Sequence, residues 1–198
     1  MADDKREVIR IAVTGHRFLD TNNDLTASIQ KVLAQIINNH PNTDHQLLSA
    51  LSEGSDQFVA RVALQYKEIK LIVPLPLTEE LYLLDFETDE GRKNFKHLLN
   101  IADHVLTLTK NSNHDSAYDV LGSYLIAQCD VLIALWNGEY SGKRGGTGEV
   151  VKNALNAGKL VYWIYGDNGN DEGEVRIKLQ KNPGDIELLG NSGDSISI

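Results

Sequence analysis

Short apolar runs alternate with longer amphipathic segments along most of the chain, and this alternation restricts the possible folds more than any other feature. Runs rich in Val, Ile and Leu, typical of buried strands, occupy residues 8–14, 46–51, 70–74, 104–108, 130–136 and 160–164. Between them apolar residues recur at helical spacing, as at Leu25, Ile29, Val32 and Ile36. Such alternation forms βαβ units with right-handed crossovers. The sequence therefore predicts an α/β fold, a Rossmann-like three-layer αβα sandwich with a mainly parallel sheet.

Glycine, proline and a change of composition mark the expected boundaries. Pro74 and Pro76 are expected to end the third strand, because proline donates no hydrogen bond to a ladder. Residues 78–101 are expected to be helical, with a break near Glu90–Gly91. Residues 1–166 form the predicted domain. Residues 167–198 are polar and rich in Gly, Ser and Asp, and they are predicted to be a tail or linker in which only residues 174–181 form a short helix.

The composition argues against several classes of partner. The 198 residues suffice for one domain with a core, and the net charge of −9 does not supply the basic footprint that nucleic acids require. Cys129 is the only cysteine and the histidines lack metal-ligand spacing, so no disulfide and no metal site are expected. The N-terminus is charged and no apolar run approaches about 20 residues. The chain is expected to be cytoplasmic, without a membrane or nucleic-acid partner.

The loops of unusual composition all follow predicted strands. In an open parallel sheet the carboxyl ends of the strands meet at one edge, where ligands bind. Four loops are therefore expected to form one binding rim. They contain Gly15, His16 and Arg17 after the first strand, Ser52, Glu53, Gly54, Ser55 and Asp56 after the second, residues 74–76 after the third, and residues 136–149 after the fifth.

The loop at residues 136–149 contains the clearest motif. It is rich in glycine, includes the adjacent cations Lys143 and Arg144, and leads into a predicted helix. Glycines let a backbone approach an anion, and the free N–H groups at a helix start attract negative charge. No Lys-Ser or Lys-Thr pair follows, so this is not a Walker A loop. A strand-to-helix turn is the structural alternative. The predicted phosphate cradle consists of Gly145, Gly146, Thr147, Gly148 and Glu149.

Other rim residues have both a binding and a structural interpretation. Arg17 either binds a phosphate or carboxylate or pairs with Glu53, and His16 is either an acid/base or a packing residue. Ser55 and Asp56 either contact a ribose or phosphate or cap a helix.

Trp136 and the segment that contains Tyr82 also have both a binding and a structural interpretation. Trp136 either stacks on a base or shields the loop, and Tyr82, Asp85 and Phe86 form either a lid or part of the core. The full predicted ligand-binding set is Gly15, His16, Arg17, Ser52, Glu53, Gly54, Ser55, Asp56, Trp136, Asn137, Lys143, Arg144, Gly145, Gly146, Thr147, Gly148 and Glu149.

Several motifs in colinear order resemble the SLOG superfamily of Rossmann-like nucleotide-binding domains, and one bacterial branch of it in particular. They include Gly-Gly-Thr-Gly-Glu-Val-Val at 145–151, Thr-Gly-His-Arg at 14–17 and Ser-Glu-Gly-Ser-Asp at 52–56. The resemblance covers about residues 8–165. The superfamily includes the LOG phosphoribohydrolases and the bacterial DNA-processing proteins. The resemblance implies a nucleotide or nucleotide-derived ligand and no further cofactor.

The sequence departs from the LOG enzymes where their chemistry resides. Their Gly-Gly-x-Gly-Thr-x-x-Glu motif ends in the Glu that serves N-glycosidic cleavage. Aligned on the first two glycines, Glu149 stands at the motif's Thr position and Lys152 at its Glu position. The Arg that the resemblance implies in the preceding helix has no counterpart in residues 115–128. Glu149 is the nearest catalytic candidate, three positions early.

Two functions from different classes follow, and whether the chain is an enzyme stays open. The displaced Glu, the missing Arg and the linker-like tail favour a ligand-recognition or sensor domain with a fused or associated effector. The alternative is an N-glycosidase acting on a nucleoside monophosphate, in which Glu149, Glu53 or Asp56 stabilises an oxocarbenium-like centre or activates water. A structural oligomerisation domain is a third reading. A homo-oligomer is compatible with the apolar face of Tyr118, Leu121 and Leu125.

Overall fold

The structure is a computed structural model that describes residues 7–19, 23–110, 113–140, 145–167, 181–190 and 196–197. The strands within these ranges are β1 (Val8–Gly15), β2 (Asp44–Leu48), β3 (Ile69–Leu75), β4 (His104–Thr107), β5 (Val131–Trp136), β6 (Leu160–Tyr165), β7 (Ile186–Leu189) and β8 (Ile196–Ser197). The helices are α1 (Asn23–Asn39), α2 (Ser55–Ala63), α3 (Glu79–Tyr82), α4 (Asp89–Asn100), α5 (His114–Gln128) and α6 (Thr147–Asn156), with a 3₁₀ turn at Leu83–Asp85.

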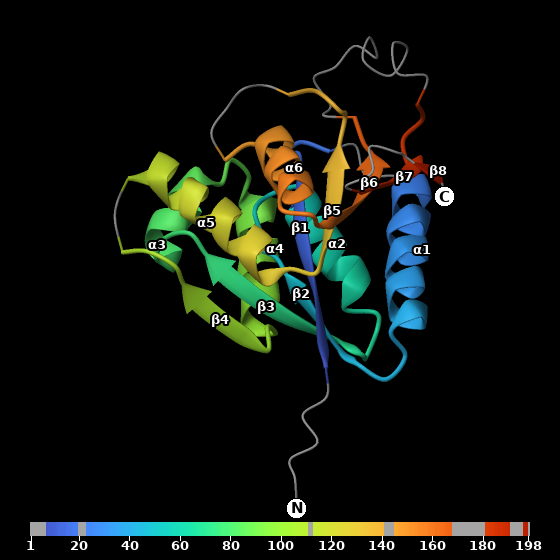
Figure 1. The fold of residues 1–198 in the computed structure, drawn as a ribbon. Helices are drawn as coiled ribbons and strands as arrows, with labels where there is room; N and C mark the ends of the chain where they lie inside the picture. Colours follow the sequence, from blue (N-terminus) through green and yellow to red (C-terminus); the bar gives the residue numbers. More distant parts are fainter. Residues whose placement is uncertain are drawn as a thin grey trace, which may run out of the picture.

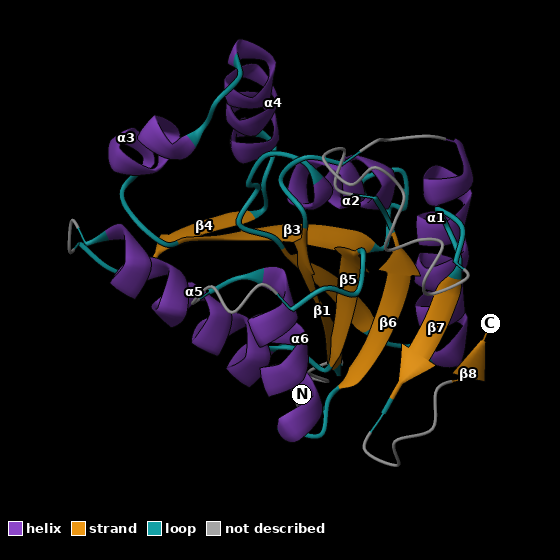
Figure 2. Cartoon of the chain, turned by 90° about the horizontal axis from the view of Figure 1, so that it is seen from above, coloured by secondary structure: helices purple, strands orange, loops and turns teal. Residues whose placement is uncertain are grey.

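The described strands form one sheet in the order β4-β3-β2-β1-β5-β6-β7-β8, which Figure 1 shows from the side. Strands β1 to β6 pair in parallel, and β7 and β8 add antiparallel pairs at one edge. Helices α1, α2 and α4 lie on one face of the sheet and α5 and α6 on the other (Figure 2). The predicted three-layer αβα sandwich with a mainly parallel sheet is confirmed.

The core lies on both faces of the central strands. In β1 and β5 the residues Ile11, Val13, Leu132 and Ile133 are fully buried. A parallel strand covered by helices on both faces must be apolar at successive positions, and for this reason these two runs are so uniform in the sequence. The six strands expected from such runs are all present.

The order of the strands creates a topological switch point between β1 and β5. From β1 the chain moves outward through α1 to β2, β3 and β4, and it then returns through α5 to β5 on the opposite side of β1. The loops after β1 and β5 therefore diverge, which leaves a crevice at the carboxyl ends of the two strands. At its floor the N–H of His16 donates to the carbonyl of Leu135 over 3.1 Å.

The helical region from 78 to 101 is broken earlier than expected. The structure places the break at residues 86–88, between the 3₁₀ turn and α4, so the expected break near Glu90–Gly91 is wrong. Thr88 caps α4 by accepting a hydrogen bond from the N–H of Gly91 at 2.8 Å. Gly91 lies inside the first turn for a packing reason, because a Cβ there would lie 2.0 Å from the Glu53 carboxylate.

Strand β3 passes through Pro74 and ends at Leu75, so Pro74 does not end it. Pairing with β2 ends at Leu48 and Ile72, and Ile72 turns its carbonyl toward that side, where it accepts from Ser49. Polar backbone groups two residues apart in a strand point the same way. At Pro74 an N–H would face β2, beyond the last residue pair of that ladder. Its absence therefore removes no hydrogen bond from the sheet.

The sheet also includes a strand from the segment expected to be a polar tail. β7 pairs antiparallel with β6, with Ile186 opposite Ile164, and Ile186 is buried. The expected helix at 174–181 lies outside the described residues except for Lys181.

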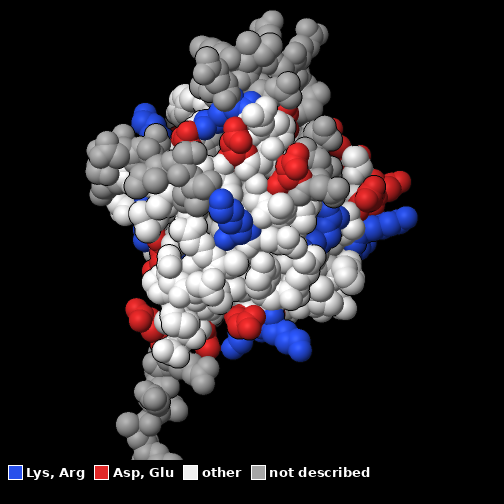
Figure 3. Space-filling view, turned by 90° about the vertical axis from the view of Figure 1, so that its right-hand side faces the viewer, with Lys and Arg blue, Asp and Glu red and all other residues white. Residues whose placement is uncertain are grey.

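On the face shown in Figure 3, Lys and Arg side chains are interspersed with Asp and Glu, and neither sign of charge forms a continuous patch.

Candidate functional site

A cavity of about 580 Å³ opens at the carboxyl ends of β1 and β5. Its size lies within the usual range for small-molecule sites, about 300–1,000 Å³. Five parts of the fold line it: the end of β1 with its loop, the β2–α2 loop, the segment from α3 to α4, one face of α5, and the β5–α6 connection with the first turn of α6. The polar and glycine residues of the lining are Thr14, Gly15, His16, Arg17, Ser52, Asp56, Tyr82, Glu87, Tyr118, Gly122, Asn137, Glu139, Gly145, Gly146, Thr147 and Gly148.

The first turn of α6 forms one wall of the cavity. Gly146 is the N-cap residue and supplies no side-chain cap, so the first N–H groups of the helix have no partner within it. A Cβ on Gly148 would lie 2.9 Å from the ring of Tyr140 and 3.2 Å from that of Trp136. Only glycine therefore lets these two rings lie against the helix start. This wall has the donors and the dipole orientation that suit an anion.

The loop after β5 is fixed to the loop after β1. The N–H of Asn137 donates to Nε2 of His16 at 3.0 Å, and burial lowers the pKa of His16, which keeps the ring neutral. Asn137 is 1% exposed. Its Oδ1 accepts from the N–H of Glu139, but its Nδ2 has no partner among the described residues. An unpaired buried donor costs about 1–3 kcal/mol, so this amide is suited to an acceptor that enters the cavity.

Arg17 brings a positive charge into the cavity. Its guanidinium donates to Tyr118 Oη at 3.0 Å and to the carbonyl of Asp85 at 3.2 Å. Tyr118 in turn donates to the Asp85 carboxylate at 2.7 Å, which His114 also contacts at 2.8 Å. The guanidinium is thus held by α5 and the segment after α3, and the pair with Glu53 that the sequence left open is not made.

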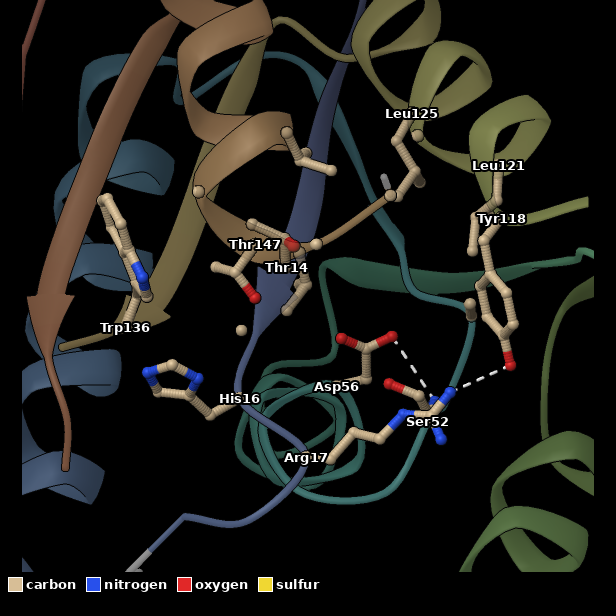
Figure 4. A pocket seen from close by; sticks show the side chains of 18 of the residues that line it. Thr14, His16, Arg17, Ser52, Asp56, Tyr118, Leu121, Leu125, Trp136 and Thr147 are labelled. Atoms are coloured by element: carbon tan, nitrogen blue, oxygen red, sulfur yellow. Dashed lines mark hydrogen bonds between the residues drawn. The ribbon is translucent and has the colours of Figure 1, made fainter. Parts of the chain in front are cut away.

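Ser52 and Asp56 lie on the same side of the cavity as Arg17 and Tyr118, with His16 and Trp136 on the opposite side (Figure 4). Asp56 is in the first turn of α2 and is 6% exposed. Its Oδ2 accepts a long hydrogen bond, 3.4 Å, from the N–H of Ser52. Burial raises the pKa of Asp56 to about 7, so the carboxyl changes charge near neutral pH.

The three residues between Ser52 and Asp56 support the site from outside the lining. The Glu53 carboxylate accepts from the N–H groups of Glu87 and Thr88 and from the Thr88 hydroxyl, at 2.6 to 2.9 Å. Ser55 donates from Oγ and N–H to the carbonyl of His16, at 2.9 and 3.0 Å. Gly54 has φ +82°, and a Cβ there would lie 2.0 Å from the Arg17 carbonyl oxygen. Ser55 and Gly54 thus hold the β1 and β2 loops against each other, and Glu53 joins the β2 loop to the segment before α4.

Glu149, the predicted catalytic candidate, also lies outside the lining. Its carboxylate accepts from the N–H of Gly145 at 2.7 Å and so closes the turn that precedes α6. Gly145 has φ +67°, and a Cβ there would lie 3.1 Å from that of Tyr118. Lys143 and Arg144 lie outside the described residues.

Two tyrosines and one helix face belong to the lining but not to the predicted binding set. Tyr82 and Tyr118 contribute hydroxyls, and Leu121, Gly122 and Leu125 of α5 form an apolar wall. The sequence marked Tyr82 as lid or core and the α5 residues as an apolar face. For the α5 residues the sequence held no signal that aims them at the carboxyl ends of β1 and β5, because the way α5 packs across the sheet depends on tertiary contacts.

These features define a Rossmann-like α/β protein with an open cavity at the switch point of its sheet. Among the described residues no helix has the length and apolar character needed to cross a membrane, and no cluster of His, Cys, Asp and Glu is arranged to hold a metal ion.

No family model and no curated protein sequence matches the chain. A solved structure to which it is similar is the Moco carrier protein from Chlamydomonas reinhardtii. The two share 20% sequence identity with a TM-score of 0.45, over 80% of this chain and 76% of that one. At this level nothing about the ligand of this chain follows from the similarity.

Proposed function

We propose that this chain binds a nucleotide or nucleotide-derived small molecule, with its phosphate at the start of α6, and acts as a SLOG-type ligand-recognition domain. The observation that carries the proposal is the make-up of the cavity. It combines three features in one space of about 580 Å³: the first turn of α6, which has no side-chain N-cap, the guanidinium of Arg17, and the amide of Asn137, whose Nδ2 has no partner within the part of the chain that the structure describes. Each of these is a donor suited to an acceptor-rich, anionic group.

The acidic chain does not conflict with an anionic ligand. The net charge of −9 is spread over the whole molecule, whereas binding depends on the local field in the cavity. The Glu53 and Glu149 carboxylates are hydrogen-bonded to backbone N–H groups outside the lining. These two carboxylates are thereby engaged by backbone donors, whereas the acids that line the cavity itself are Asp56, Glu87 and Glu139.

The variant Gly146→Asp is expected to lose nucleotide binding without loss of fold. Gly146 has φ −74° and ψ 159°, which any residue adopts, and Asp is among the best N-cap residues. Its carboxylate would occupy the place proposed for the phosphate. Because like charges side by side cost several kcal/mol, the affinity for AMP is expected to fall on the order of 100-fold. Calorimetric titration of the purified protein with AMP, GMP, CMP and UMP measures this.

The matched control is Gly146→Asn, which caps the helix with a neutral side chain of the same shape. It should retain most of the affinity that Gly146→Asp loses, and both variants should melt at or above the temperature of the wild type. Equal affinities for the Asp and Asn variants would contradict a phosphate at this position.

Cleavage of an N-glycosidic bond is the second candidate function, and Asp56 is the observation that favours it. Of the three acids that the sequence offered, it is the one that lines the cavity, and its pKa of about 7 suits a general acid or base. Release of free base from AMP, followed by chromatography, tests this activity. Turnover that Asp56→Asn abolishes and Glu149→Gln retains would support an enzyme that uses Asp56.

A further inference from the structure

The cavity contains a second group of polar side chains, apart from the α6 wall. It consists of Asp56 and Ser52 from the β2–α2 loop, Tyr82 from α3, and Arg17 with its partner Tyr118. Tyr82 and Tyr118 have ring centroids 6.3 Å apart. The charges of Asp56 and Arg17 both act on the Tyr82 hydroxyl. These side chains therefore form one neighbourhood, on the side of the cavity where Figure 4 shows Asp56, Arg17 and Tyr118.

The Tyr82 hydroxyl is buried, and no described residue of the fold forms a hydrogen bond with it. The residue is 0% exposed, and Oη makes no hydrogen bond among the described residues. The ring is held edge-on by Phe86 and Phe95, with centroids 5.3 and 5.7 Å away. Since the ring is wedged between two buried aromatics, the hydroxyl cannot turn outward to water. A phenylalanine would pack as well and avoid the cost of an unpaired hydroxyl, so the hydroxyl is suited to a partner that comes from the cavity.

Asp56 sets the chemistry of that partner. Its carboxyl is buried and accepts a long hydrogen bond from the N–H of Ser52, and the Ser52 side chain and the backbone of Ala50 also interact with it. Near neutral pH it alternates between a form that accepts hydrogen bonds and a form that also donates one. An anionic group would be repelled by the ionised form, and an ammonium group, which donates but cannot accept, would leave the O–H of the acid form unpaired. A hydroxyl donates and accepts, and so it suits both forms.

We propose that Asp56 and Tyr82 form a subsite for a vicinal diol, such as the two ribose hydroxyls of a nucleotide. This assignment rests on the proposed function, because it takes the phosphate of the same molecule to lie at α6. In this arrangement Asp56 binds one hydroxyl and Tyr82 Oη binds the other, and the hydrogen bond from Arg17 to Tyr118 holds the adjoining wall of the cavity in place. The subsite thus selects ribonucleotides over nucleotides that lack both hydroxyls.

The test compares a nucleotide with its counterpart that lacks the diol. The wild-type protein is titrated in a calorimeter with the four common ribonucleoside monophosphates, and the tightest binder is then compared with its 2′,3′-dideoxy form. The ribonucleotide is expected to bind about tenfold or more tightly, from two hydrogen bonds. In Tyr82→Phe this preference should fall to about threefold or less, while the affinity for the dideoxy form changes by less than about twofold.

Two further variants complete the design. Asp56→Asn should lose the preference as Tyr82→Phe does, and Asp115→Asn makes the same change at the second position of α5, where the side chain is exposed, and should keep it. Tyr82→Phe removes a single unpaired atom, so it remains informative if the Asp56 variant folds poorly. Equal wild-type affinities for the two nucleotide forms would overturn the subsite and leave the phosphate site standing. A preference that survives in Tyr82→Phe and Asp56→Asn would also overturn it. Failure of every monophosphate to bind would overturn both.

Discussion

Replacing Asp56 by Asn is expected to stabilise the protein above neutral pH, although the residue belongs to the proposed binding site. Burial raises the pKa of Asp56 from 3.8 to about 7 in the folded state. The folded protein therefore keeps a proton that the unfolded chain releases across this interval. The stability that the neutral carboxyl provides is fully present below pH 3.8 and is lost as the pH rises through about 7. Because one pKa unit corresponds to about 1.4 kcal/mol, the loss amounts to about 4 kcal/mol as an upper value.

Urea unfolding of the wild type and Asp56→Asn between about pH 4.5 and pH 8 measures this effect. The difference in free energy of unfolding should grow in favour of the Asn variant as the pH rises, and it should level off once Asp56 is ionised. Asp115→Asn serves as the matched control, because it makes the same change at an exposed position of α5. A pH-independent difference for Asp56→Asn would contradict a buried carboxyl that titrates near neutrality.

The variant Gly54→Ala is expected to show the largest loss of stability that a single methyl group causes in this protein. Gly54 has φ +82° and ψ −120°, a conformation that side chains rarely adopt. Its added Cβ would lie 2.0 Å from the carbonyl oxygen of Arg17 and 2.4 Å from that of His16, and both are backbone atoms. Relief of this overlap must move the β1 loop off α2. We expect a loss of at least about 3 kcal/mol in the free energy of unfolding.

The comparison for this variant is Gly122→Ala, the same change in the middle of α5. Its Cβ would lie 3.4 Å from Val150 Cγ2, an ordinary contact distance, and alanine favours a helix over glycine by about 1 kcal/mol. Gly122→Ala should therefore be neutral or stabilising in a denaturant titration in which Gly54→Ala unfolds early. Similar midpoints for the two variants would show that the β1 and β2 loops are not packed as tightly as the distances indicate.

Both expected results depend on the packing of the β1 loop on the start of α2, and the sequence predicted only part of that arrangement. It placed Gly15–Arg17 and Ser52–Asp56 at the same edge of the sheet, because parallel strands end together. It could not rank the acids of this rim. Glu53 and Asp56 are three residues apart, yet one binds the backbone at the start of α4 and the other lines the cavity. That difference depends on a segment more than thirty residues away in the chain.

The boundaries that were wrong have the same origin. The break before α4 was expected at Glu90–Gly91 because glycine weakens helices, but Gly91 is needed for contact with Glu53 and the cap is Thr88. Pro74 was expected to end β3, but its missing N–H points to a side where the ladder has already ended. In each case a local rule was correct in itself and a contact distant in sequence decided the outcome.

The sequence by itself determined the layered α/β fold, because apolar runs buried on both faces and amphipathic helices between them leave few other ways to cover a parallel sheet. It also determined that the glycine-rich segment leads into a helix at the edge of the sheet where the cavity opens. Only the tertiary structure decided which polar groups share the cavity. Asn137 and Tyr82 lie there with polar atoms that no other described residue pairs, Glu149 closes a turn, and Asp56 is buried near the charge of Arg17. Burial and hydrogen-bond satisfaction are properties of the packed chain, and a residue's type and spacing do not specify them.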